Sequence, residues 1–145
     1  MPKASVKRLI NKEKDKLIDF VLDINKYPEF IPFCESSKIF KKDENEELIH
    51  IIADLTIGKG PFKDTFKSDV NFFKKKDEII VKNIGGPLNY LENKWKFYEK
   101  NKITEVNFEI NFEIKNKFLN ILMTKSFSYG LEKIADAFQK RAESL

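Results

Sequence analysis

Apolar and polar residues alternate along most of the middle of the chain. The alternation is most regular over residues 105–114, where Val, Phe or Ile at every second position is separated by Glu or Asn. Residues 47–57, 62–72 and 93–99 show the same period of two, and residues 78–84 are a short strand candidate. This pattern predicts an antiparallel sheet with one face in water. The turn-forming stretches KKDENEE, GKGP, KKKD, GGP and EKNK separate the strands and are short enough for hairpins.

The N-terminal part combines a short strand with a short amphipathic helix. Residues 2–10 are a strand candidate, and Asn11 offers an N-cap for the helix that follows. The apolar face of this helix has the spacing i, i+3, i+4, i+7 and consists of Leu17, Phe20, Val21 and Ile24. Proline lacks an N–H and clashes with the preceding turn, so Pro28 and Pro32 are expected to end or kink the helix.

The last quarter of the chain changes to a helical period. Residues 116–142 carry an apolar stripe at three- and four-residue spacing, which predicts one long C-terminal helix. A large sheet twists and curls, so it is expected to wrap around this helix. The predicted fold class is therefore α+β: a curved antiparallel sheet of about seven strands, short helices after the first strand, and a long C-terminal helix. Residues 1–145 form a single domain in this prediction.

Composition limits the partners of this domain. The 27 Lys and Arg residues exceed the 23 Asp and Glu residues, which gives a net charge of +4. This balance permits ribosomal RNA or an anionic membrane as a partner, but acids follow bases nearly everywhere and DNA is not expected. A basic surface candidate comprises Lys59, Lys63, Lys67, Lys74, Lys75 and Lys76. The alternative for these lysines is a set of solvated strand edges and a turn.

Catalytic and metal-binding residues are scarce. Cys34 is the only cysteine and His50 the only histidine, so an internal disulfide and a His/Cys zinc site are excluded. A Cys34–His50 nucleophile pair stays open at this point. No catalytic residue and no metal site are predicted. No apolar run approaches a membrane span and no secretory signal is evident, so the predicted location is the cytoplasm, with a peripheral position at the inner membrane as the alternative.

Two local features suggest a cavity. The segment INKYPEFIPFC, residues 24–34, holds three aromatic residues and two prolines where a plain turn would be polar. Asp64 and Ser68 alternate with Phe62 and Phe66 on the face predicted to lie inside. They either reach water at a strand end or line a wetted cavity and orient a polar headgroup.

Three stretches resemble a known family. LIDFVLDINKYPEFIPFCESSKI, GGPLNYLENKWKF, and INFEI with the later AFQKRAESL are similar to the motifs of START-related helix-grip domains. These domains form the polyketide cyclase/dehydrase and lipid-transport superfamily. The resemblance is to the subgroup that contains the coenzyme Q-binding proteins and the ribosome association toxins. The chain departs from its motifs at Phe33, where Trp is usual, at Leu88 and Asn89, and at Asn93, where Gly is usual.

The resemblance implies a START-like lipid-binding domain with a hydrophobic cavity between sheet and helix. The segment after the first helix would form its wall and lid, although its aromatics could instead plug one end of a solid core. The candidate cavity residues are Tyr27, Pro28, Phe30, Ile31, Pro32, Phe33, Phe62, Asp64, Phe66, Ser68, Pro87, Leu88, Trp95, Phe97, Phe108, Met123 and Phe127.

Three functions follow from the resemblance. The first is non-catalytic binding or transport of a polyprenyl quinone such as ubiquinone, in support of respiratory electron transport. The alternative is a ribosome-associated, toxin-like factor that binds the large subunit and blocks subunit association. The third is a polyketide cyclase or dehydratase, which would need acid–base groups such as Asp64, His50, Tyr90 or Glu92. No cofactor is expected beyond the lipid ligand itself.

Overall fold

Seven strands form one antiparallel sheet in the computed structural model, as the alternation predicted. The structure describes residues 3–32, 34–58, 63–86, 88–114 and 131–145. The strands are β1 (Lys3–Ile10), β2 (Cys34–Glu44), β3 (Leu48–Ile57), β4 (Asp64–Phe73), β5 (Glu78–Gly85), β6 (Leu88–Lys100) and β7 (Ile103–Ile114). Their order in the sheet is β1-β7-β6-β5-β4-β3-β2, so all neighbours except β1 and β7 are consecutive hairpin partners.

The turn between β6 and β7 shows how the sequence sets the register. Asn101 and Lys102 both adopt positive φ, at 54° and 66°, as the two central residues of a tight hairpin require. Across this hairpin Trp95 lies opposite Phe108 and Phe97 opposite Val106. The predicted apolar positions of both strands therefore share one face of the sheet.

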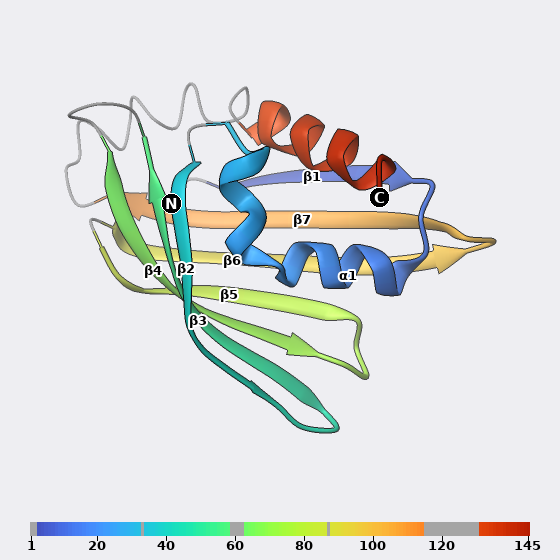
Figure 1. Cartoon of the computed structure of the whole chain (residues 1–145), viewed down its shortest axis with the longest axis horizontal. Coiled ribbons are helices and arrows are strands. Elements are labelled where there is room, and N and C mark those ends of the chain that lie inside the picture. The colour runs from blue at the N-terminus through green and yellow to red at the C-terminus, as the bar shows by residue number, and fades with distance from the viewer. Residues whose placement is uncertain (1–2, 33, 59–62, 87, 115–130) are drawn as a thin grey trace.

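Three helices accompany the sheet in the described parts of the chain. They are α1 (Lys14–Leu22), the 3-10 helix η1 (Ile24–Glu29) and a C-terminal helix, described over residues 131–143. Figure 1 shows the C-terminal helix in red alongside β1 at one side of the curved sheet. The predicted helical stretch before residue 131 lies outside the described residues.

The boundaries of α1 differ from the prediction at both ends. The N-cap is Glu13 rather than Asn11, because the free N–H of Lys14 donates to Glu99 Oε1 at 2.7 Å and fixes the first turn there. The helix ends at Leu22, where Asp23 leaves the helical region of backbone space. Pro28 therefore does not end α1 but lies inside η1, a short 3-10 helix that loses little from one missing N–H.

The core lies between the inner face of the sheet and the helices. Ile51, Ala53 and Ile79 are completely buried on β3 and β5, and Leu17 is 1% exposed on α1. These side chains belong to one hydrophobic cluster that also takes in Phe97 of β6 and Ala142 of the C-terminal helix. Burial on alternate positions of β3, β4 and β7 confirms the predicted inner and outer faces of these strands.

Candidate functional site

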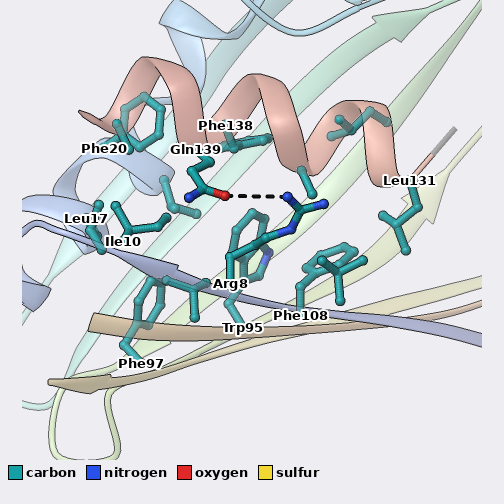
Figure 2. Close-up of a pocket in the computed structure, with 16 residues that line it drawn as sticks. Arg8, Ile10, Leu17, Phe20, Trp95, Phe97, Phe108, Leu131, Phe138 and Gln139 are labelled. Atoms are coloured by element: carbon teal, nitrogen blue, oxygen red, sulfur yellow. Dashed lines mark hydrogen bonds between the residues drawn. The ribbon is translucent and has the colours of Figure 1, made fainter. Parts of the chain in front are cut away.

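A cavity lies between the sheet, α1 and the C-terminal helix (Figure 2). Its volume is about 70 Å³. Its lining comes from four sources: β1 with Val6, Arg8 and Ile10, α1 with Leu17, Phe20 and Val21, the strands β6 and β7 with Trp95, Phe97, Val106 and Phe108, and the C-terminal helix with Leu131, Ile134, Ala135, Phe138, Gln139 and Ala142. The cavity thus occupies the place that the helix-grip resemblance implied.

The cavity is apolar except at Arg8 and Gln139 among the described residues that line it. Arg8 donates from Nη1 to Asp136 at 2.7 Å and to Gln139 at 3.4 Å, and its Nη2 pairs with Glu132. Two carboxylates from the C-terminal helix therefore neutralise the single guanidinium on β1. Figure 2 shows the Arg8 side chain directed toward the helix, with its bond to Gln139 dashed.

Phe138 is the centre of an aromatic cluster beside the cavity. Its ring centroid lies 5.3 Å from those of Trp95 and Phe30, 5.4 Å from Tyr27 and 5.7 Å from Phe20. These are edge-on contacts of the kind that aromatic rings prefer. The cluster joins the C-terminal helix to α1, to the sheet and to the segment around η1.

The segment 24–34 packs into this cluster rather than standing free. The buried Tyr27 hydroxyl donates to the carbonyl of Val21, and burial raises the pKa of Tyr27 well above its ordinary value. Phe30 stacks on Phe20 at 5.2 Å, and Ile31 packs against the core. Pro28 and Pro32 are half-buried beside them. Tyr27, Phe30 and Ile31 are not among the described residues that line the cavity, so their role as a lid stays a prediction.

Other predicted cavity residues divide into three groups. Trp95, Phe97 and Phe108 line the cavity. Ser68 is buried and Phe66 half-buried on the inner face of β4, whereas Asp64 is exposed, so it is not a cavity residue and the alternative of a strand end that reaches water holds for it. Asp64 is the first residue of β4, and the end of this strand reaches water. Phe33, Phe62, Pro87, Met123 and Phe127 lie outside the described residues, as do the side chain of Leu88 and the whole of Lys59.

The structure separates Cys34 from His50. Cys34 is buried and lies opposite Ile57, at the far end of β3 from His50. The seven residue steps from His50 to Ile57 along β3 span roughly 23 Å at about 3.3 Å per residue. Burial raises the pKa of the Cys34 thiol, while His50 is bonded to Asp69 on the outer face. These two residues do not form a nucleophile pair.

Sequence reasoning missed the contribution of β1 to the cavity. Val6, Arg8 and Ile10 line it, although none of the predicted cavity residues came from β1. The available signal was the period of two along β1, which places these three residues on one face. Arg8 stands out there as a cation among apolar inward positions.

The basic surface candidate is largely neutralised. Lys63 pairs with Glu35 at 3.1 Å, Lys74 with Glu44 at 2.7 Å and Lys75 with Glu47 at 3.5 Å. The bond from Lys74 also lowers the pKa of Glu44. Lys67 and Lys76 instead lie over aromatic rings, at 5.2 Å from Phe40 and 5.9 Å from Phe73.

The described part of the chain holds neither a membrane-spanning helix nor a candidate metal site. Its helices are too short or too polar to span a bilayer. The same residues hold no cluster of three or more His, Cys, Asp or Glu side chains that could bind a metal ion.

Known proteins resemble this chain over nearly its whole length. The ribosome association toxin RatA of Rickettsia prowazekii is 32% identical over 133 residues, which cover 90% of this chain and 88% of that protein. The mitochondrial coenzyme Q-binding protein COQ10 of Dictyostelium discoideum is 26% identical over 149 residues, with 95% and 71% covered. The solved structure of a START superfamily protein from Mycobacterium smegmatis superposes with a TM-score of 0.82 at 16% identity and covers 98% of this chain and 97% of its own, which supports the shared fold.

The family profile described as polyketide cyclase / dehydrase and lipid transport matches residues 10–139. This range includes α1, all strands from β2 to β7 and most of the C-terminal helix. The chain therefore belongs to the polyketide cyclase / dehydrase and lipid transport family.

Proposed function

We propose that this protein is a ribosome-associated factor that binds the large subunit and hinders its joining to the small subunit. The observation that carries the proposal is the 32% identity to RatA of Rickettsia prowazekii over 90% of the chain. A factor of this kind acts through its outer surface and needs no open cavity. The geometry of the cavity is consistent with that requirement.

The size of the cavity argues against a quinone carrier in this conformation. Ligand pockets commonly measure about 300–1,000 Å³, and one water takes up about 30 Å³ of liquid. The described cavity, at about 70 Å³, is far smaller than such a pocket.

A non-catalytic role is part of the same proposal. The acid–base candidates Asp64 and His50 lie on exposed or outer positions rather than in the cavity. Tyr90 donates its hydroxyl to Glu92 at 3.1 Å, which raises the pKa of Tyr90, and neither residue lines the cavity. Proton transfer within the cavity thus has no donor or acceptor among these candidates.

Sedimentation with purified ribosomal subunits tests the proposal. The protein is expected to migrate with the large subunit and to reduce the fraction of joined ribosomes in proportion to its concentration. An unrelated basic protein of similar size serves as the control for charge alone. If the protein stays at the top of the gradient even at low salt, the proposal is wrong.

Hydrophobic ligand binding is the second candidate, because the cavity wall is almost purely apolar. Trp95, Phe108 and Phe138 present ring faces and edges to it. Lipid extraction and native mass spectrometry of freshly purified protein would detect a prenyl quinone. The variant Ala135→Trp fills the cavity, and loss of the ligand from this variant would support the second candidate.

A further inference from the structure

The outer face of β2, β3 and β4 carries an ordered polar grid whose parts are far apart in the sequence. Lys38 of β2 lies opposite Asp54 of β3, which in turn lies opposite Lys67 of β4. The neighbouring row is made of hydroxyl residues in the same register, Ser36, Thr56 and Thr65. Thr56 and Thr65 exchange a hydrogen bond of 2.9 Å between their side-chain oxygens.

A β-bulge adds an aromatic ring to this grid. The register of β2 shifts between Ile39 and Lys41, which leaves Phe40 outside the ladder and half exposed on the outer face. The Nζ of Lys38 lies 5.0 Å from the centre of the Phe40 ring, and that of Lys67 lies 5.2 Å from it. One exposed ring therefore holds two ammonium groups from separate strands.

The two lysines keep their charges available. Neither ammonium group forms an ion pair with a carboxylate of the described residues, in contrast to Lys63, Lys74 and Lys75. Asp54 lies between them in register, but its Oδ1 is buried and has no hydrogen-bond partner among the described residues. Only this one oxygen is closed to solvent and Asp54 as a whole is half-buried, so the two exposed lysines leave this row of the grid with a net charge of +1.

The geometry points to this surface, the Lys38–Phe40–Lys67 surface, as a contact for RNA phosphates. The inference rests on the proposed function and names the part of the chain that would contact ribosomal RNA. Two strand spacings of about 4.8 Å separate the lysine backbones by roughly 10 Å, slightly more than the Debye length of about 8 Å at physiological salt. Lysines with adjacent Ser and Thr hydroxyls are the groups that proteins use on phosphate oxygens.

An anionic membrane is the competing partner, and the polar surroundings weigh against it. A ring that inserts into lipid needs apolar neighbours, whereas Phe40 lies between two ammonium groups. The adjacent row exposes Ser36 and Thr65, which offer hydrogen bonds rather than apolar area. RNA, with regular phosphates and 2′-hydroxyls, fits both rows.

The test measures ribosome binding of two matched double variants as a function of salt. Lys38→Ala with Lys67→Ala removes two charges from the proposed surface, and Lys74→Ala with Lys75→Ala removes two charges elsewhere. The first pair is expected to lower the slope of log affinity against log salt by about 2, since each phosphate contact contributes about 1. If this variant and wild type bind equally at 1 M salt, its affinity at about 0.15 M should be on the order of 40-fold below that of wild type, whereas the second pair should change the affinity little.

The variant Lys38→Arg with Lys67→Arg keeps the charges and is expected to keep the binding. Equal losses for both alanine pairs, or no loss for the first pair while wild type binds, would overturn the proposed surface. Failure of wild type to bind ribosomes would instead overturn the proposed function. Binding to vesicles of phosphatidylserine and phosphatidylcholine is measured last. If Lys38→Ala with Lys67→Ala loses vesicle binding but keeps ribosome binding, the surface contacts lipid and the proposed RNA contact is wrong.

Discussion

The guanidinium of Arg141 lies 5.4 Å from the centre of the Phe30 ring. The same Arg141 donates from Nη2 to Glu29 at 2.7 Å. One side chain of the C-terminal helix thus holds both the last residue of η1 and the aromatic residue that follows it. This contact fixes the aromatic segment against the helix from outside, while Phe138 holds it from inside.

Replacing Arg141 should loosen this attachment. Arg141→Ala is expected to lower the free energy of unfolding by roughly 0.5–1 kcal/mol through the lost cation–π contact. Urea denaturation measures this change, and Arg141→Lys should lose less because it keeps a positive charge near the ring. An unchanged midpoint in Arg141→Ala would show that the contact contributes nothing in solution.

The Arg141–Glu29 bond also predicts a pH effect. The hydrogen bond from Arg141 lowers the pKa of Glu29 in the folded protein. Because the pKa of Glu29 is lower in the folded protein than in the unfolded protein, its ionised carboxylate stabilises the fold above the unfolded-state pKa. This stabilisation is lost as the pH falls through the folded-state pKa. In Arg141→Ala the carboxyl pKa of Glu29, followed by NMR, should rise toward its ordinary value. The difference in the free energy of unfolding between Arg141→Ala and wild type should become smaller at pH values below the pKa of Glu29. A Glu29 pKa that is the same in both proteins would contradict the effect assigned to Arg141.

Phe138 should be the most sensitive aromatic position of the described residues around the cavity. It contacts the rings of Phe20, Tyr27, Phe30 and Trp95, so Phe138→Ala would remove four ring contacts and enlarge the cavity. The expected loss is about 3 kcal/mol in the free energy of unfolding. Tyr98→Ala is the matched control, because Tyr98 is 48% exposed and should cost much less. Similar losses for both variants would refute the central role of Phe138.

The sheet was predictable from sequence because its signal is local. Alternation over residues 105–114 and 47–57 reports directly which side chains are buried on β7 and β3, and the structure confirms those faces. The start of α1 was not predictable in the same way. Asn11 is the better intrinsic N-cap, but the helix begins at Lys14 because Glu99, far away on β6, accepts its N–H.

The site was predicted only in part, for a related reason. Trp95, Phe97 and Phe108 lie at inward-facing positions of the alternating pattern, in strands that also contain family motifs. They line the cavity. Asp64 also lies at an alternate position of β4 that belongs to the inner face. Its burial, however, depends on how far the helices extend over the sheet, and the alternation does not encode this. The approach of both Lys38 and Lys67 to the Phe40 ring depends on the register shift between Ile39 and Lys41, and nothing local in the sequence marks that bulge.

Gly86 should resist substitution on steric grounds. Its φ is +124°, and a Cβ at this position would lie 2.9 Å from the carbonyl oxygen of Thr65. Gly86→Ala is therefore expected to lower stability by roughly 1–3 kcal/mol. Gly85→Ala is the control next to it, since its nearest contact, the Cβ of Lys67, lies at an ordinary 3.5 Å. Thermal melts of the two variants should separate clearly, and equal melting temperatures would contradict the strained backbone at Gly86.

A last prediction concerns the ion pair that ties α1 to the turn before β5. Lys14 Nζ donates to Asp77 Oδ2 at 2.9 Å, and this hydrogen bond raises the pKa of Lys14. Because the pKa of Lys14 is higher in the folded protein than in the unfolded protein, the ion pair stabilises the fold fully below the unfolded-state pKa. This stabilisation is lost as the pH rises through the folded-state pKa. Asp77→Asn removes the charge but tolerates the positive φ of 51° at this position.

Because both side chains are about one third exposed, the expected cost of Asp77→Asn near neutral pH is below about 1 kcal/mol. The difference from wild type should shrink toward zero as the pH rises past the ordinary lysine range. Glu47→Gln is the matched control, since the Lys75–Glu47 pair is 80% and 75% exposed and should show no such trend. Urea denaturation of the three proteins from neutral to strongly alkaline pH checks this. A difference for Asp77→Asn that persists unchanged at the alkaline end would mean that Asp77 acts through the turn itself and not through Lys14.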